Sequence, residues 1–196
     1  MKTIITLIFF GVLTYASVEK PKIQYKQGYC QGYRSFNDFD PKRFFKGNWS
    51  LTHSTPSNRV TASTICRDYE LKEHENGTIQ ATYGYNENEC GNRYDVHCNG
   101  TENSKLLGEF NFDCHLYNGE EESKTHIDAA FIATDYEKYC VVYRCVTIDG
   151  QFAEDNIFIL FRPDKTDEEL AKKIAEHYGL TIDDFISRKN ATCTNK

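Results

Sequence analysis

Eight cysteines are the residues of this sequence whose chemistry is easiest to infer. They are spread over the chain as Cys30, Cys66, Cys90, Cys98, Cys114, Cys140, Cys145 and Cys193. An even number of cysteines behind a secretion signal predicts four disulfides formed in an oxidising compartment. A metal site is the alternative, but the sequence has no C-x-x-C and no pair of closely spaced histidines. We therefore expect no metal, and spacing alone leaves every disulfide connectivity open.

The sequence carries no recognisable set of catalytic side chains. The sequence has no nucleophile–base pair in a known motif, no H-E-x-x-H and no glycine-rich phosphate loop. The acidic runs at 120–122 and 167–169 are interpreted as a solvated loop and a helix start, so we expect no enzyme. The net charge of −6, without a Lys/Arg cluster, argues against nucleic acid or an anionic membrane as the main partner. A basic protein surface stays possible.

Four N-x-S/T sequons, at Asn48, Asn76, Asn99 and Asn190, predict a glycoprotein. The first residues predict secretion. A basic Lys2, an apolar run over 3–12 and a small-x-small-like end at 14–16 are typical of a signal peptide. We expect cleavage after residue 16, and the apolar run is too short to span a bilayer. Residues 17–196 then form a single, soluble, extracellular domain.

Eight short strands are predicted to position these residues. They are expected at 48–53, 65–74, 78–85, 93–98, 108–117, 125–133, 139–148 and 156–162, from alternating polar and apolar residues between turn signals. Glu75-Asn76-Gly77 is a strong hairpin signal, and the fourth strand is expected to end at Asn99-Gly100. Strands in chain order with short turns favour an all-β fold, an eight-stranded antiparallel up-and-down barrel, over the alternative of a sandwich. Closure also leaves no exposed sheet edge.

A C-terminal helix follows the strands. Thr166 to Glu169 reads as a capping box, and Leu170, Ala171, Ile174 and Tyr178 fall on one face. Gly179 is expected to end this helix, and Thr181 to cap a second short one. An amphipathic helix after eight strands is expected to pack outside the barrel.

Three short motifs carry a resemblance to a known family. Gly47 and Trp49 form a G-x-W motif on the first strand, and Thr134, Asp135 and Tyr136 form a T-D-Y turn before the seventh. With Arg162 at the end of the eighth strand, they resemble the conserved motifs of lipocalins. In that family the arginine lies over the tryptophan and closes the barrel floor. Such a cation–π contact contributes on the order of 1–2 kcal/mol when it is desolvated.

Longer segments narrow this resemblance. Residues 39–47, 135–139 and 142–145 are similar to the salivary lipocalins of blood-feeding triatomine bugs, in particular to the triabin, pallidipin and triafestin branch. The resemblance covers nearly the whole chain. It implies the pairs Cys30–Cys145, Cys66–Cys193 and Cys98–Cys114. Cys90–Cys140 is then expected by elimination only.

No haem is expected. Nitrophorins, which resemble this branch, hold haem through a histidine in a Y-H-Y-N stretch, where this chain reads Tyr83-Gly84-Tyr85-Asn86. Glycine cannot ligate iron, so we expect no haem and no other cofactor.

The resemblance implies a monomeric salivary protein that impairs host haemostasis by sequestering a small platelet or vascular agonist. Eicosanoids, ADP and biogenic amines are the ligand classes that it implies. An eight-stranded barrel has room for one small molecule. From strand parity, the candidate ligand-binding residues are Leu51, His53, Phe112, Phe131, Tyr143 and Phe158. An anionic eicosanoid would need a cationic anchor such as Arg67 or Arg144, whereas an amine would need an acidic residue at the rim.

A second hypothesis is a protein-binding inhibitor. Triabin-like relatives act on thrombin, and triafestin-like ones on the contact-phase kallikrein–kinin system, through the outside of the barrel. An acidic chain suits a basic protease surface. Residues 120–122 and 164–169 would be the first contacts to test. Sequestration of a small molecule is favoured over this second hypothesis because a closed barrel supplies a pocket.

Overall fold

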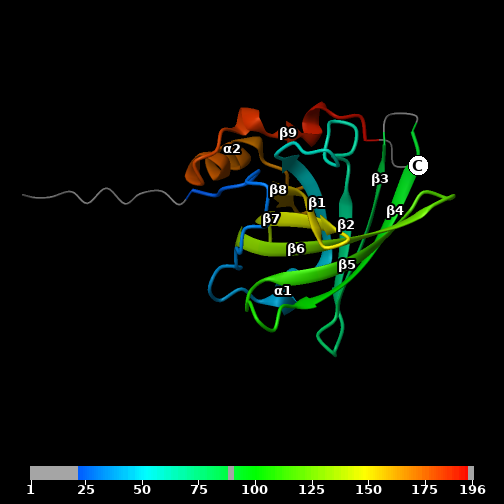
Figure 1. Ribbon diagram of the computed structural model, residues 1–196. Coiled ribbons are helices and arrows are strands. Elements are labelled where there is room, and N and C mark those ends of the chain that lie inside the picture. Colours follow the sequence, from blue (N-terminus) through cyan, green and yellow to red (C-terminus); the bar gives the residue numbers. More distant parts are fainter. Residues whose placement is uncertain (1–21, 88–90, 194–196) are drawn as a thin grey trace, which may run out of the picture.

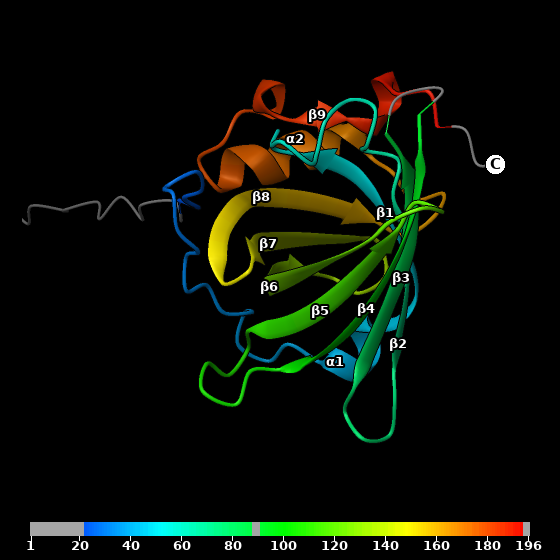
Figure 2. The same ribbon diagram turned by 45° about the vertical axis from the view of Figure 1, so that its right-hand side comes forward.

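The structure, a computed structural model, describes residues 22–87 and 91–193. This part forms a closed barrel of antiparallel strands with a helix packed on its outside (Figures 1 and 2). The barrel strands are β1 (Lys46–Ser54), β2 (Asp68–Glu73), β3 (Ile79–Asn86), β4 (Arg93–Glu102), β5 (Phe110–Tyr117), β6 (Glu122–Thr134), β7 (Tyr139–Ile148) and β8 (Gln151–Phe161). The predicted signal peptide, residues 1–16, lies outside the described residues.

Strand β1 closes the barrel because it pairs with both ends of the sheet. Its first half pairs with β2 from Lys46 to Ser50, and its second half pairs with β8 from Ser50 to Ser54. Strands β2 to β8 each pair with the next in the chain. The predicted up-and-down barrel is therefore confirmed, and the sandwich is excluded. One short strand that we did not predict, β9 (Ile186–Ser187), adds to the end of β1.

One end of the barrel is closed by aromatic side chains. The helical turn α1 (Pro41–Phe44), capped by the Asp40 carboxylate, delivers Phe44 to the core as predicted. The Trp49 indole stacks on Phe44 with 5.0 Å between ring centroids, and its Nε1–H donates to the Phe44 carbonyl at 3.3 Å. Trp49 is fully buried. The one polar group of the only tryptophan is thus satisfied inside the core.

The predicted contact between Arg162 and Trp49 is confirmed. The guanidinium carbon lies 3.9 Å from the indole centroid. Nη1 donates to the carbonyls of Lys46 at 2.8 Å and Asn48 at 3.1 Å, and Nε donates to the Tyr136 carbonyl at 3.1 Å. Arg162 therefore joins β1, the turn before β7 and the indole at the closed end.

The T-D-Y turn is held by its own side chains. The Asp135 carboxylate accepts backbone N–H groups from residues 137, 138 and 139. Tyr136 has a left-handed φ of 67°. This conformation directs its hydroxyl to the backbone N–H of Asp40, at 2.8 Å. The motif therefore fastens the segment before α1 to the closed end of the barrel.

Helix α2 (Glu168–His177) packs against the outside of the barrel (Figure 1). Its N-cap is Asp167, whose carboxylate accepts the Leu170 N–H, so the predicted cap at Thr166 is wrong by one residue. Ala171 and Ile174 are buried as predicted, and Gly179 follows the helix with a φ of 72°. The short helices η1 (Ile182–Asp184), preceded by Thr181, and η2 (Arg188–Asn190) complete the described chain. Among the described residues, no helix is long and apolar enough to cross a membrane.

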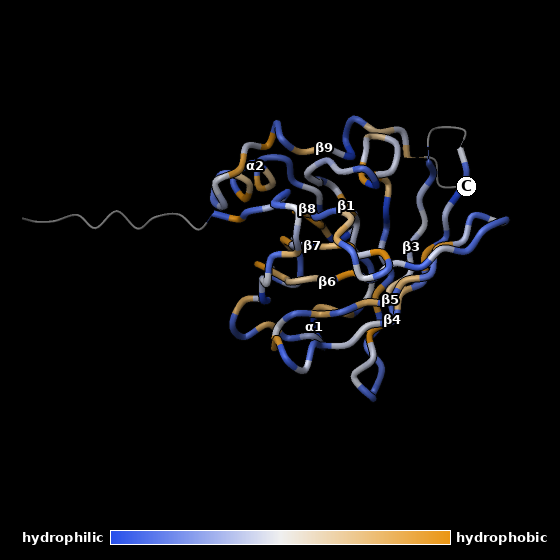
Figure 3. Tube along the Cα trace, viewed as in Figure 1, coloured by the Kyte–Doolittle hydropathy of each residue, from blue (hydrophilic) through white to orange (hydrophobic). Residues whose placement is uncertain are grey.

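Two apolar clusters result from the alternation of side chains along the strands. One fills the barrel, and the other lies between β7, β8, helix α2 and the N-terminal segment 22–40. Figure 3 shows hydrophobic residues along the strands and mostly hydrophilic ones in the hairpin turns. The barrel interior is therefore a candidate for an apolar ligand site.

Three disulfides agree with the pairs that the resemblance implied: Cys30–Cys145, Cys66–Cys193 and Cys98–Cys114. The expected Cys90–Cys140 pair is not found. Cys90 lies outside the described residues, but Cys140 is a buried free thiol near the start of β7. The pair expected by elimination is therefore wrong at Cys140, whose thiol is fully buried and not part of a disulfide.

Candidate functional site

The barrel contains a cavity of about 90 Å³. Its wall is almost entirely apolar and aromatic, with contributions from Leu71, Ala81, Phe112, Phe131 and Phe158. Three polar side chains interrupt this wall, those of Tyr69, Tyr83 and Arg144. Small-molecule sites in proteins usually combine such an apolar lining with a few placed polar groups. The cavity is smaller than the ~300–1,000 Å³ that is typical for drug-sized ligands.

Arg144 is the only charged residue that lines the cavity in the described part of the chain. It comes from β7 and is 6 % exposed. Its Nη1 donates to Glu154 Oε1 and to Asn156 Oδ1, both at 2.9 Å, and its guanidinium carbon lies 5.5 Å from the Phe158 ring centroid. Glu154 is also buried. The cavity cation thus has one carboxylate partner.

A second buried arginine lies beside the cavity. Arg67, 1 % exposed, comes just before β2, and its guanidinium carbon lies 5.8 Å from the Tyr83 ring and 4.5 Å from the Tyr85 ring. Nε donates to the Thr64 carbonyl at 2.9 Å and Nη2 to the Arg59 carbonyl at 2.5 Å. In the described part of the chain, no ion pair joins Arg67 to a carboxylate.

Tyr69 interacts with both arginines. Burial raises its pKa to about 12, although the charges of Arg67 and Arg144 both act to lower it. The phenol is therefore neutral at physiological pH and can donate its O–H. Two guanidinium groups, one phenol and one carboxylate leave this end of the cavity with an excess of positive charge. Such a site favours an anion over a cation.

Of the six predicted ligand-binding residues, Phe112, Phe131 and Phe158 line the cavity. Leu51 is fully buried in the barrel cluster, but it does not line the cavity. Whether these residues bind a ligand stays a prediction.

His53 does not face the cavity, contrary to the strand parity that we predicted. The pairing of β1 with β8 shifts register between Leu51 and His53, and this bulge reverses the direction of the side chains that follow. The His53 ring instead lies 3.2 Å from Glu168 Oε2 on helix α2. Burial lowers its pKa, although Glu168 opposes this shift. His53 therefore joins the barrel to the helix.

Tyr143 also points to the outside of the barrel. Its hydroxyl donates to Asp155 at 3.1 Å and accepts the Gln31 N–H at 2.7 Å, and its ring packs against Tyr33. Alternation along β7 places Val142 and Arg144 inside and Tyr143 and Cys145 outside. Tyr143 thus anchors the N-terminal segment, which the Cys30–Cys145 disulfide also holds.

Position 84 faces outward as well. A side chain placed on Gly84 would meet the Arg93 and Asp95 side chains on the neighbouring strand, while Tyr83 lies in the cavity wall. A histidine at this position would not reach the cavity. The glycine at position 84 is therefore weaker evidence against haem than the sequence comparison with the Y-H-Y-N stretch suggested.

The predicted surface features divide into two groups. The sequon residues Asn48, Asn76, Asn99 and Asn190 are all exposed, and so are Glu120 and Glu121 at the turn between β5 and β6. In the segment 164–169, by contrast, Asp167 caps α2 and pairs with Lys138 at 2.8 Å, and Glu168 contacts His53. The second acidic segment thus has structural roles.

Comparison with known proteins fits this architecture. A family model described as Triabin matches residues 22–173. The chain belongs to the Triabin family. Triafestin-2 of Triatoma infestans is 31 % identical over 97 % of this chain and 92 % of its own. This triabin-family chain therefore has a relative that matches it over nearly its full length.

Two solved structures extend the comparison. A tryptamine complex of the amine-binding protein of Rhodnius prolixus aligns with a TM-score of 0.68 over 85 % of this chain and 91 % of the other, at 16 % identity, which shows the shared lipocalin fold. A leukotriene C4 complex of LTBP1 aligns with a TM-score of 0.54 over 76 % of this chain and 89 % of the other, at 26 % identity.

Tyr69 and Tyr83 in the cavity wall, and Glu154 against Arg144, are the polar residues that the sequence did not reveal for this triabin-family chain. Both tyrosines have the parity of the buried residues Leu71 and Ala81, so the alternation of β2 and β3 carried a signal for them. Glu154 carried none, because the predicted strand began at 156 and left it in a turn. The structure starts β8 at Gln151.

Proposed function

We propose that this chain is a secreted, monomeric, non-enzymatic lipocalin that sequesters a small amphipathic anion in its barrel. A lipid carboxylate of the eicosanoid type is the ligand class that suits the site best. Removal of such an agonist impairs platelet activation or vessel constriction in the host. This function agrees with the resemblance to salivary lipocalins of blood-feeding bugs and with the three disulfides, which fit an extracellular protein.

The excess of buried positive charge beside an apolar cavity carries this proposal. A buried charge without a partner is costly, and an anion that reaches it recovers much of that cost. Arg144 lies in the cavity wall, and Arg67 adds a second positive charge that interacts with the wall residue Tyr69. The phenylalanine-lined remainder of the cavity suits an alkyl or alkenyl tail.

A biogenic amine suits the site less well. Its ammonium would need a carboxylate, and Glu154, the one beside Arg144, is already paired with it. ADP is also anionic, but its polar base and ribose would face a wall of apolar side chains. That LTBP1, whose structure aligns with this chain, forms a complex with the anionic lipid leukotriene C4 supports this preference. No metal or haem is needed for such binding.

Three ligands with one tail and different heads test this proposal. Decanoate, decanol and decylamine should bind in that order of affinity when measured by isothermal titration calorimetry. Arg144→Met should weaken decanoate binding by about 10–100-fold, because a hydrogen bond to a charged group contributes ~1.5–3 kcal/mol. Decanol binding should not change. Arg93→Met, which alters an exposed arginine, is the control.

Equal affinity for all three heads would refute the anion preference. Platelet aggregation offers a test of function. The protein should block aggregation that a lipid agonist induces, and Arg144→Met should not.

The second candidate function is inhibition of a basic host protein, such as thrombin or a contact-phase protease, through the outside of the barrel. The exposed carboxylates of Glu120 and Glu121 favour it, because they lie together at a hairpin turn. Replacement of both by glutamine should slow association with such a protein, most strongly at low salt. Inhibition of thrombin-induced but not lipid-induced aggregation would support this function over sequestration of a small anion.

A further inference from the structure

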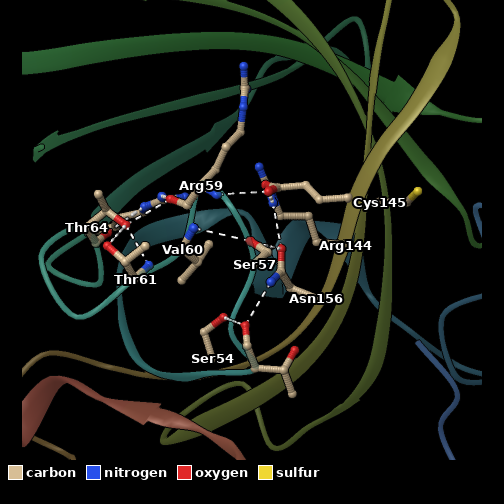
Figure 4. Close-up of polar contacts among 12 residues, drawn as sticks. Ser54, Ser57, Arg59, Val60, Thr61, Thr64, Arg144, Cys145 and Asn156 are labelled. Carbon is tan, nitrogen blue, oxygen red and sulfur yellow. Dashed lines mark hydrogen bonds and ion pairs between the residues drawn. The ribbon is translucent and has the colours of Figure 1, made fainter. Parts of the chain in front are cut away.

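The loop between β1 and β2, residues 55–67, packs into the open end of the barrel. Val60 and Ile65 are fully buried, and both belong to the apolar cluster inside the barrel. Within the loop, the Thr64 hydroxyl donates to the Arg59 carbonyl at 2.8 Å, and Arg67 donates to the same carbonyl. The loop is therefore a compact unit with an apolar inner surface. Figure 4 shows its polar contacts.

This loop has few polar connections to the barrel between its ends. The Arg59 backbone N–H donates to Glu154 Oε2 at 3.0 Å, and the Ser57 hydroxyl contacts Asn156 Oδ1 at a long 3.5 Å. At the N-terminal end, Thr55 bonds to the backbone of Ile157, and at the C-terminal end Cys66 is held by its disulfide. The Glu154 carboxylate is thus the main polar contact of the loop centre.

The same carboxylate holds the cavity cation. Glu154 Oε1 accepts from Arg144 Nη1 at 2.9 Å, while Oε2 accepts from Arg59. Burial raises the pKa of Glu154, but the charge and hydrogen bond of Arg144 outweigh it and hold the pKa below its usual range. The carboxylate is ionised at neutral pH. It competes with any anion for Arg144.

We propose that Glu154 determines the anion affinity of the cavity and couples ligand binding to the loop. An anionic head that takes Arg144 deprives Glu154 of its cation. A buried carboxylate without a cation is unfavourable, so Glu154 turns toward solvent and the Arg59 N–H loses its acceptor. The loop centre then loosens. This inference rests on the proposed binding of anions in the barrel.

Asn156 keeps the Arg144 guanidinium in place when an anionic head replaces Glu154. Its Oδ1 also accepts from Arg144 Nη1 at 2.9 Å, and its side-chain N–H donates to the Thr55 carbonyl at 2.8 Å. Arg144 therefore stays in place when Glu154 leaves it. Removal of the Glu154 charge should strengthen anion binding rather than disorder the site.

Glu154→Gln and Glu154→Ala separate the two roles. Glutamine removes the charge but keeps an oxygen that can accept the Arg59 N–H, whereas alanine removes both. We expect Glu154→Gln to bind decanoate about tenfold more tightly than the unmodified protein and decanol with unchanged affinity. Glu109→Gln, which alters a buried carboxylate at the opposite, closed end of the barrel, is the matched control and should leave both affinities unchanged.

Hydrogen exchange of residues 56–62, followed by mass spectrometry, tests the coupling. Saturating decanoate should accelerate exchange there in the unmodified protein, saturating decanol should not, and Glu154→Gln should show no response to decanoate. Protection of the loop by both ligands, or an unchanged decanoate affinity in Glu154→Gln, would overturn the proposal.

The ligand-free proteins distinguish failure of this inference from failure of the proposed function. Without ligand, Glu154→Ala should exchange faster in the loop than Glu154→Gln. If decanoate does not bind at all, the proposed function fails, and this comparison still decides the role of Glu154 in holding the loop. Equal loop exchange in both variants would overturn that role.

Discussion

Replacement of Arg162 by methionine tests how the closed end of the barrel is stabilised. Methionine keeps an apolar stem over Trp49 but removes the guanidinium. The change therefore deletes the cation–π contact at 3.9 Å and three hydrogen bonds to backbone carbonyls. The fold itself should persist, because the indole keeps its stacking on Phe44 and its hydrogen bond.

The size of the loss follows from these contacts. A cation–π contact contributes ~0.5–2 kcal/mol, and each net hydrogen bond ~0.5–1.5 kcal/mol. Arg162 is only partly buried, so water can reach the carbonyls that it leaves, and the lower half of the second range applies. We expect the free energy of unfolding to fall by about 2–5 kcal/mol.

Urea denaturation followed by tryptophan fluorescence measures this loss directly, because Trp49 is the only tryptophan and lies under Arg162. Arg43→Met is the control. Its guanidinium carbon lies 4.1 Å from the Tyr136 ring centroid, but the residue is exposed, so its loss should stay below about 1 kcal/mol. If Arg162→Met is no less stable than Arg43→Met, the guanidinium is not what stabilises the closed end.

Three further predictions concern one partly exposed group, His126, and two buried ones, Cys140 and Phe131. Burial lowers the pKa of His126, but the carboxylates of Asp113 and Asp128 outweigh it and raise the pKa above 6.5. Its stabilising effect is then full below pH 6.5 and is lost as pH rises through the folded pKa. Urea unfolding at a series of pH values should show that His126→Gln removes this pH dependence of the free energy of unfolding. The same pH dependence in the variant and the unmodified protein would contradict the prediction. Burial raises the pKa of the Cys140 thiol well above its usual value, so a thiol reagent should label it only after unfolding, and rapid native labelling would refute its burial. Phe131→Ala should enlarge the cavity and cost about 3–5 kcal/mol, and a loss below ~1 kcal/mol in urea would show that the site collapses.

The barrel and its closed end could be predicted from the sequence because their signals are local. Alternation marked the strands, and short motifs marked the contact between Trp49 and Arg162, which the structure confirms. The limits of the strands were less certain. Strand β8 begins five residues before the predicted start, because residues 151–155 alternate weakly and contain charges.

The predicted direction of a side chain was wrong in two cases, one because of a β-bulge and one because the wrong strand parity was assigned. One extra residue in β1 turns His53 outward, and no residue type in that stretch marks the bulge. Tyr143 is a different case. The expected Cys30–Cys145 pair already required Cys145 to face the N-terminal segment, and residues two apart share a face. The sequence therefore contained the information that Tyr143 points outward and that Arg144 points inward.

Arginines illustrate why a binding site is harder to predict than a fold. At the closed end, three carbonyls and an indole surround the Arg162 guanidinium, which is partly exposed, and this arrangement is structural. At the open end, Arg67 and Arg144 are almost completely buried, and of the two only Arg144 pairs with a carboxylate in the described part of the chain. The two ends differ in how far nearby groups, often distant in the sequence, compensate the charge of each guanidinium. Sequence identifies an arginine on a strand, but only the packing of distant segments such as 55–67 and β8 shows whether its charge is left for a ligand.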